Sequence, residues 1–173
     1  MKPPKKNTSP KLEGWTLTSG LIGGGETHYQ NPSVSDVMNS LDTLSPRVWS
    51  AYLTLGKSPK EGTYQNYCLL CIVEEGYYCQ IRQYGSSRRD YRHYRLLLPN
   101  EHGSCDEIEE TRPYFTTGYD PDYTAVTTAL LSFIADPERL PEIPSWRWMD
   151  NTEKIMRTED ASHDRPGVFR NRW

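Results

Sequence analysis

Two of the four cysteines are spaced as C-x-x-C, a spacing that can serve zinc binding or thiol–disulfide exchange. Cys68 and Cys71 lie inside the uncharged segment 67–73, which is typical of a central β-strand buried on both faces. Because strand residues three apart point to opposite faces, the pair cannot hold one ion without a bulge. A second C-x-x-C is missing, since Cys79 and Cys105 are far apart in the sequence. We therefore predict buried, reduced thiols, with no metal and no cofactor.

Catalysis by a nucleophile or by acid–base transfer would need other residues. His102 is close to Cys105, but the polar loop around them has no glycine-framed nucleophile turn and no orienting partner. Residues 106–110 carry four acids in five positions, which is typical of a solvated face. The glycines at 23–25 lack the Gly-Lys-Ser/Thr ending of a phosphate loop. We therefore predict that the protein is not an enzyme.

Residues 82–95 interleave arginines with tyrosines, a combination that can bind phosphates and stack on bases. The whole chain has a formal net charge of −3, however, and so has no general attraction to nucleic acid. A nucleic-acid-binding or adaptor module that uses this hairpin is the alternative hypothesis. The default interpretation is a solvated hairpin whose arginines meet the acidic run. Its basic and aromatic residues are Arg82, Tyr84, Arg88, Arg89, Tyr91, Arg92, Tyr94 and Arg95.

Length and composition predict a single domain with polar ends. The chain has 173 residues, of which 35% are hydrophobic and 25% charged. We expect a disordered basic tail at 1–11, one domain at 12–150 and a polar C-terminal tail at 151–173. No run of 18 apolar residues could span a membrane, and no apolar stretch follows the first lysines as in a secretory signal. The predicted location is therefore the cytoplasm.

The first half of the domain alternates between helix and strand patterns. Val34, Val37, Met38, Leu41 and Leu44 repeat at helical spacing, with Ser33 as the N-cap and Pro46 as the end of the helix. Residues 12–30 read as an irregular lead-in with one short strand, and the glycines there as a flexible turn. Strands are predicted at 48–55, 67–73, 77–84 and 91–98, with a further strand within 110–117.

A second helix is predicted from the stripe Tyr123, Val126, Leu130, Phe133 and Ile134. Pro137 ends it, and the prolines that follow keep the chain extended up to Trp146 and Trp148 in a last edge segment. The order of elements predicts an α+β fold, in which two helices pack on one face of a mainly antiparallel β-sheet.

This order, together with "ALLSFIADPERLPEIPSWRW", resembles the bacterial immunity proteins of polymorphic toxin systems, in particular immunity family one. In that family a helix with a Phe near its end precedes a short G-E-R-P connection and a Trp in a strand. Phe133, then Pro137, Glu138 and Arg139, then Trp146 stand at comparable places here. The likeness covers residues 33–148.

The resemblance implies a protein that binds a cognate toxin, often a deaminase acting on nucleic acid, and occludes its active site. Such a toxin needs a basic groove, and clustered carboxylates on an inhibitor would steer it into place. Exposed tyrosines are the natural anchors of such an interface. The predicted partner-binding residues are Glu74, Glu75, Tyr77, Tyr78, Asp106, Glu107, Glu109, Glu110 and Tyr114.

Overall fold

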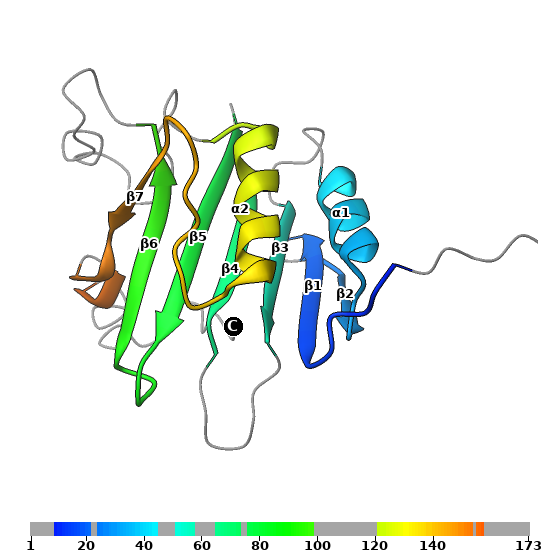
Figure 1. Cartoon of the computed structure of the whole chain (residues 1–173), viewed down its shortest axis with the longest axis horizontal. Coiled ribbons are helices and arrows are strands. Elements are labelled where there is room, and N and C mark those ends of the chain that lie inside the picture. The colour runs from blue at the N-terminus through cyan, green and yellow to red at the C-terminus, as the bar shows by residue number, and fades with distance from the viewer. Residues whose placement is uncertain are drawn as a thin grey trace, which may run out of the picture.

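The computed structural model describes residues 9–21, 24–44, 51–57, 65–73, 76–98, 121–153 and 155–157. Over these ranges the chain forms one β-sheet and two longer helices (Figure 1). The strands are β1 (Trp15–Leu21), β2 (Glu26–Gln30), β3 (Ala51–Lys57), β4 (Tyr67–Val73), β5 (Gly76–Tyr84), β6 (Tyr91–Leu97) and β7 (Arg147–Asp150). The helices are α1 (Val34–Thr43) and α2 (Tyr123–Ala135).

The sheet has seven strands in the order β2-β1-β3-β4-β5-β6-β7, and every neighbouring pair is antiparallel. Strands β3 to β6 follow one another as a meander. The α1 segment carries the chain from the edge strand β2 back to β3, and α2 lies between β6 and β7 in the chain. The predicted α+β class with a mainly antiparallel sheet is confirmed.

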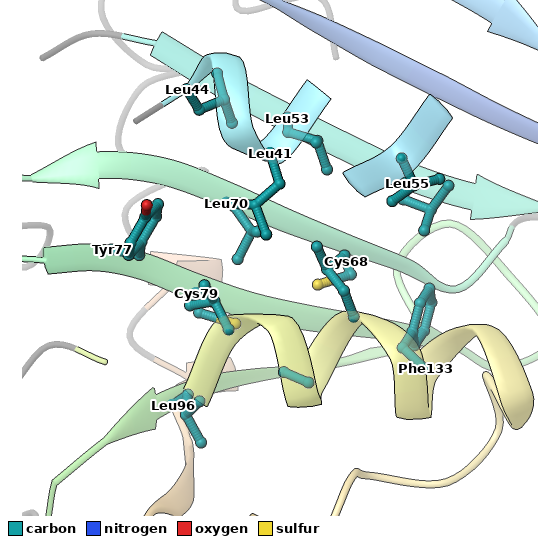
Figure 2. Packing of buried hydrophobic residues seen from close by; sticks show 14 of the residues in the cluster. Leu41, Leu44, Leu53, Leu55, Cys68, Leu70, Tyr77, Cys79, Leu96 and Phe133 are labelled. Carbon is teal, nitrogen blue, oxygen red and sulfur yellow. The ribbon is translucent and has the colours of Figure 1, made fainter. Parts of the chain in front are cut away.

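Both helices pack on the same face of the sheet, which we call the helix face (Figures 1 and 2). Strand pairing sets Leu17, Leu55, Cys68 and Ile81 side by side across four strands. All four side chains are fully buried, and each large apolar side chain buried in this way contributes about 1.5–3 kcal/mol. The helices cover this row with Val37, Leu41, Val126, Leu130 and Phe133.

The helix ends follow from local hydrogen bonds. Ser33 caps α1, because its hydroxyl accepts the Asp36 N–H while the Asp36 carboxylate accepts the Ser33 N–H at 2.7 Å. Asp122 caps α2 by accepting the Ala125 N–H at 2.8 Å. The helix then ends at Ala135, two residues before Pro137. Both helices therefore begin and end close to where the sequence predicted them.

The prediction of an irregular lead-in at 12–30 is wrong. This segment forms the β1–β2 hairpin, and β1 pairs with β3 over its whole length. All five residues of β2 are exposed, so it has no alternation of apolar and polar positions that would reveal a strand. The predicted strand within 110–117 lies outside the described residues.

The folded region also extends beyond the predicted limits of residues 12 and 150. Lys11 forms a β-bridge with Ser33. After β7, the chain makes short helical turns in which Thr152 and Ile155 are only 5% and 4% exposed. Residues 151–153 and 155–157 therefore pack against the domain, within the stretch predicted as a polar tail. Residues 1–8 and 158–173 lie outside the described part of the chain.

Candidate functional site

The side chains with the most chemical potential gather on the face of the sheet opposite the helices, which we call the second face. Alternation along β5 and β6 places arginine, tyrosine and histidine there, with Arg82 directly opposite His93 and Tyr84 opposite Tyr91. Strand β5 also contributes Tyr78, and the neighbouring strand β4 adds Tyr67. We call this group the tyrosine–arginine cluster; its members are Tyr67, Tyr78, Arg82, Tyr84, Tyr91, His93 and Arg95.

In the outer half of the cluster, one guanidinium lies among three tyrosine rings. The Arg82 guanidinium carbon is 4.4 Å from the centre of the Tyr91 ring and 5.8 Å from that of Tyr67. The Tyr84 ring lies 5.9 Å from Tyr91 and 6.4 Å from Tyr67, measured between ring centres. These distances suit cation–π and tilted aromatic contacts. Tyr67, Arg82 and Tyr84 are half-buried, so part of each remains accessible to a partner.

The inner half of the cluster is buried. Arg95 is 1% exposed, and its guanidinium carbon lies 4.7 Å from the centre of the Tyr78 ring. His93 is also 1% exposed, with its Nε2 3.4 Å from the Tyr78 hydroxyl and its Nδ1 3.4 Å from Arg82 Nη2. Burial, and then the Arg82 charge, lower the pKa of His93 to about 3. The imidazole is therefore neutral near pH 7 and poorly matched to proton transfer there.

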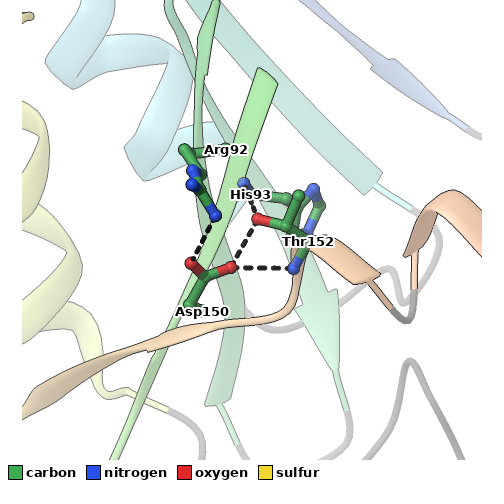
Figure 3. Close-up of polar contacts among 4 residues, drawn as sticks. All are labelled: Arg92, His93, Asp150 and Thr152. Atoms are coloured by element: carbon green, nitrogen blue, oxygen red, sulfur yellow. Dashed lines mark hydrogen bonds and ion pairs between the residues drawn. The ribbon is translucent and has the colours of Figure 1, made fainter. Parts of the chain in front are cut away.

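Asp150 attaches the end of β7 to β6 next to the cluster (Figure 3). Its carboxylate accepts the Thr152 N–H at 2.9 Å and the Thr152 hydroxyl, and that hydroxyl oxygen accepts the His93 N–H at 2.9 Å. The other carboxylate oxygen lies 3.6 Å from Arg92 Nη1. Asp150 thus holds Thr152 beside the backbone of His93, and it also pairs with Arg92, one of the arginines of the 82–95 hairpin.

The five arginines of that hairpin therefore have different surroundings. Arg82 and Arg95 lie over tyrosine rings, while Arg92 pairs with Asp150. Arg88 and Arg89 are exposed in the turn between β5 and β6. The turn is closed by Asp90, whose carboxylate accepts the Ser86 N–H at 2.9 Å. The acidic run that was expected to meet these arginines lies outside the described residues.

The cysteines occupy opposite faces of β4, as their spacing predicted. Cys68 lies in the core of the helix face beside Cys79, and Cys71 faces the other way, opposite Tyr52 and Tyr78. Burial raises the pKa of Cys71 to about 12, and burial together with Cys68 raises that of Cys79. Within the described ranges, no three metal-ligating side chains come together. Cys105 and His102 are outside these ranges.

Two of the three tyrosines predicted as exposed anchors are in fact buried. Tyr77 is 6% exposed in the core of the helix face, where its ring lies 6.5 Å from that of Tyr123. Tyr78 is 5% exposed on the second face, beside Arg95. Adjacent strand residues alternate, so the two tyrosines lie on opposite faces of β5, and each is buried on its own face. The remaining predicted partner residues, Glu74, Glu75, Asp106, Glu107, Glu109, Glu110 and Tyr114, lie outside the described part of the chain.

The cluster members Tyr67, Tyr78 and His93 were not predicted as one site with Arg82. The sequence does contain a signal for this shared face, because its polar and aromatic residues recur at every second position. They are Arg82 and Tyr84 in β5, and Tyr91, His93 and Arg95 in β6. That period places each set on one face of its strand. The pairing of β4 with β5, which adds Tyr67, is a long-range feature without a local signal.

No helix in the described ranges is long and apolar enough to cross a lipid bilayer. Comparison with models of known protein families, with curated proteins and with solved structures found no match for the chain.

Proposed function

We propose that this chain is an immunity protein, which binds a cognate bacterial toxin and occludes its active site, and that the toxin acts on nucleic acid, for example as a deaminase. The observation that carries the proposal is the half-buried patch formed by Tyr67, Arg82 and Tyr84 on the second face. Tyrosine and arginine are among the residue types that contribute most to the binding energy of protein interfaces. This patch replaces Tyr77 and Tyr78 as the proposed aromatic anchor.

The way the patch is held favours tight binding. Tyr67 and Arg82 lie directly opposite each other on paired central strands, and Arg82 is positioned by the Tyr91 ring below it. Ordering a free side chain on binding costs about 0.5–1.5 kcal/mol, and a side chain that is already ordered avoids most of that cost. A partner could therefore gain most of the contact energy from these rings.

The state of the reactive groups supports an inhibitor that performs no chemistry. A thiol acts as a nucleophile only in its thiolate form, and the raised pKa values of Cys71 and Cys79 keep both protonated. The pKa of His93 is shifted in the other direction, to about 3, so its imidazole does not accept a proton near neutral pH. In this proposal, the acids at 74–75 and 106–110 steer the basic groove of the toxin towards the patch.

The test is co-expression with a candidate toxin, namely any protein that a neighbouring reading frame is found to encode with a variable C-terminal domain. The wild-type chain is expected to restore growth and to form a stable complex. Tyr84→Ala is expected to weaken that complex by about tenfold or more, mainly through faster dissociation. Tyr123→Ala is the matched control, because Tyr123 is an exposed tyrosine on α2 above the opposite face.

Absence of growth protection by the wild-type chain would contradict the immunity function. If protection is complete but a folded Tyr84→Ala variant binds as tightly as the wild type, the second face is not the interface. The growth assay thus tests the immunity function, and the binding of the Tyr84→Ala variant tests where the toxin binds.

The alternative, a nucleic-acid-binding module, is favoured by one observation: Arg88 and Arg89 are exposed in the turn next to the aromatic patch. It predicts oligonucleotide binding that falls steeply with salt and is lost in the triple variant Arg88→Ala, Arg89→Ala, Arg92→Ala. The immunity proposal predicts that this variant still protects cells from the toxin. Binding titrations at two salt concentrations, alongside the growth assay, distinguish the two.

A further inference from the structure

The strand β2 forms one edge of the sheet, and all five of its residues are exposed. Tyr29 is 41% exposed, and the nearby Leu21 at the end of β1 is 42% exposed. Natural proteins usually protect such an edge with lysine, proline or a bulge, and β2 has no lysine, no proline and an unbroken register with β1. An edge of this kind can accept another strand.

The hydrogen bonds at the two ends of the hairpin show which backbone groups face outward. The Asn31 N–H donates to the Trp15 carbonyl at 2.8 Å, and the Leu21 N–H donates to the Gly25 carbonyl at 3.3 Å. Hydrogen-bonded pairs alternate along an antiparallel ladder, so the residues of β2 bonded to β1 are Thr27 and Tyr29. The N–H and C=O groups of Glu26 and His28 therefore point away from β1, and within the described residues they have no backbone partner.

We propose that β2 pairs antiparallel with the β2 of a second copy of this chain, with His28 of each copy at the two-fold axis. In this register Thr27 of one copy faces Tyr29 of the other, twice, and a β-branched residue opposite an aromatic ring is a favourable cross-strand pair. Glu26 faces Gln30, whose amide can donate to the carboxylate. The strand is thus complementary to itself in its outward backbone hydrogen bonds and in its cross-strand side-chain pairs.

The side chain of His28 is already arranged to leave the edge accessible. Its Nδ1 lies 3.0 Å from the Thr18 hydroxyl, on the β1 residue directly opposite, so the ring leans over β1 and away from the open side. Its Nε2 lies 3.2 Å from Glu26 on the same strand. The neighbouring two-fold register, with Thr27 at the axis, would place Tyr29 opposite Gly25 and would give the ring no partner. The His28-centred register therefore makes better use of the exposed tyrosine.

The dimer does not depend on toxin binding and is tested on the purified full chain by sedimentation velocity from about 1 μM to about 1 mM. The wild-type chain is expected to shift from monomer to dimer with concentration. His28→Pro removes an outward N–H without breaking a bond to β1, and it is expected to raise the dimer dissociation constant by about tenfold or more. His28→Ala keeps that N–H and is expected to leave the dimer intact.

Disulfide trapping tests the register independently of how well the proline variant folds. Hydrogen-bonded antiparallel partners have Cα atoms about 5.5 Å apart, within the range for a disulfide. His28→Cys should therefore form a covalent dimer on oxidation, whereas Glu26→Cys should not, since its two copies would be about 14 Å apart along the strands. A wild-type chain that stays monomeric at all concentrations, a folded His28→Pro variant that dimerises normally, or equal trapping at positions 26 and 28 would overturn the proposal.

Discussion

The guanidinium of Arg82 lies 4.4 Å from the centre of the Tyr91 ring, on the strand that pairs with its own. A partly desolvated cation–π contact of this kind contributes about 1–2 kcal/mol. Arg82→Met keeps the apolar stem of the side chain and removes its charge, so we expect a loss of about 1 kcal/mol in the free energy of unfolding. Urea denaturation of the variant and the wild type at neutral pH measures this difference in the free energy of unfolding.

Arg88→Met in the exposed turn is the control for this change, with an expected effect within about 0.5 kcal/mol. Equal effects of the two substitutions would show that the contact of Arg82 with the rings adds nothing to stability. In that case, contacts other than those of Arg82 with the rings would have to hold the patch of Tyr67, Arg82 and Tyr84 in place.

His93 makes the stability depend on pH in a predictable direction. Its pKa is about 3 in the folded protein, because of burial and the Arg82 and Arg95 charges, although Asp150 acts in the opposite direction. In the unfolded chain the value is about 6.5. As the pH falls below about 6.5, the unfolded chain binds a proton that the folded chain does not, and stability decreases by up to about 1.4 kcal/mol per pH unit until about pH 3.

The substitution His93→Gln should remove this contribution, so its stability relative to wild type should improve steadily between about pH 6.5 and about pH 4. Urea midpoints at several pH values in that window provide the measurement. His28→Gln is the matched control, since the His28 side chain is 58% exposed. A constant difference between His93→Gln and wild type across the window would mean that His93 is not held neutral in the fold.

The sequence predicted the central strands and the helices because their signals are local. The run 67–73 is apolar, Ser33 is a good N-cap, and Pro137 ends α2. The thiol arrangement followed from alternation in the same way. Each of these depends only on residues within one element.

The β1–β2 hairpin and the candidate site could not be predicted in the same way. All residues of β2 are exposed, so its sequence lacks the alternation of apolar and polar residues by which a strand is recognised. The burial of Tyr77 and Tyr78 depends on what covers each face of β5, which is decided by distant segments. Alternation alone could place Arg82 and His93 on one face, but only the register of β5 with β6 puts them directly opposite each other.

The capped helix starts should contribute similar amounts to stability. Ser33→Ala removes the acceptor for the Asp36 N–H, and Asp122→Ala removes the acceptor for the Ala125 N–H. Each substitution is expected to lower the free energy of unfolding by about 1 kcal/mol. Thermal or urea unfolding tests this, with Ser35→Ala as a control, because Ser35 is exposed in the first turn of α1 and caps neither helix. A negligible effect at Ser33 would mean that the capping box is not formed in solution.

The thiols on β4 and β5 should be unreactive while the protein is folded. Cys68 and Cys79 are fully buried, and the Cys71 pKa of about 12 leaves few thiolates at about pH 8. Mass spectrometry after brief alkylation is expected to find these three sites unmodified in the native protein and modified in urea. Rapid native labelling of Cys71, or copurification of stoichiometric zinc, would instead restore the C-x-x-C as a chemical site.

Asn66 joins three segments through one side chain that is 9% exposed, so it should be sensitive to small changes. Its amide NH₂ donates to the Pro137 carbonyl at 3.1 Å and to Glu138 Oε2 at 3.0 Å, while its oxygen accepts the Tyr84 N–H at 2.8 Å. Asn66→Asp keeps the acceptor but replaces two donors by a charge facing a carbonyl and a carboxylate. We expect a loss of about 2–4 kcal/mol in the free energy of unfolding near neutral pH.

Lowering the pH should reduce this loss of stability. Burial and the nearby Glu138 would raise the pKa of the introduced carboxyl above its value in the unfolded chain. The protonated folded form is therefore favoured as the pH falls. The stability difference between Asn66→Asp and wild type should therefore be smaller at about pH 4 than at about pH 7. Gln83→Glu is the matched amide-to-acid control, since Gln83 donates to the Glu138 carbonyl at 3.0 Å from a half-buried position. If both variants lose the same amount at both pH values, the connection through Asn66 does not hold the end of β5, and Tyr84 is positioned by the sheet alone.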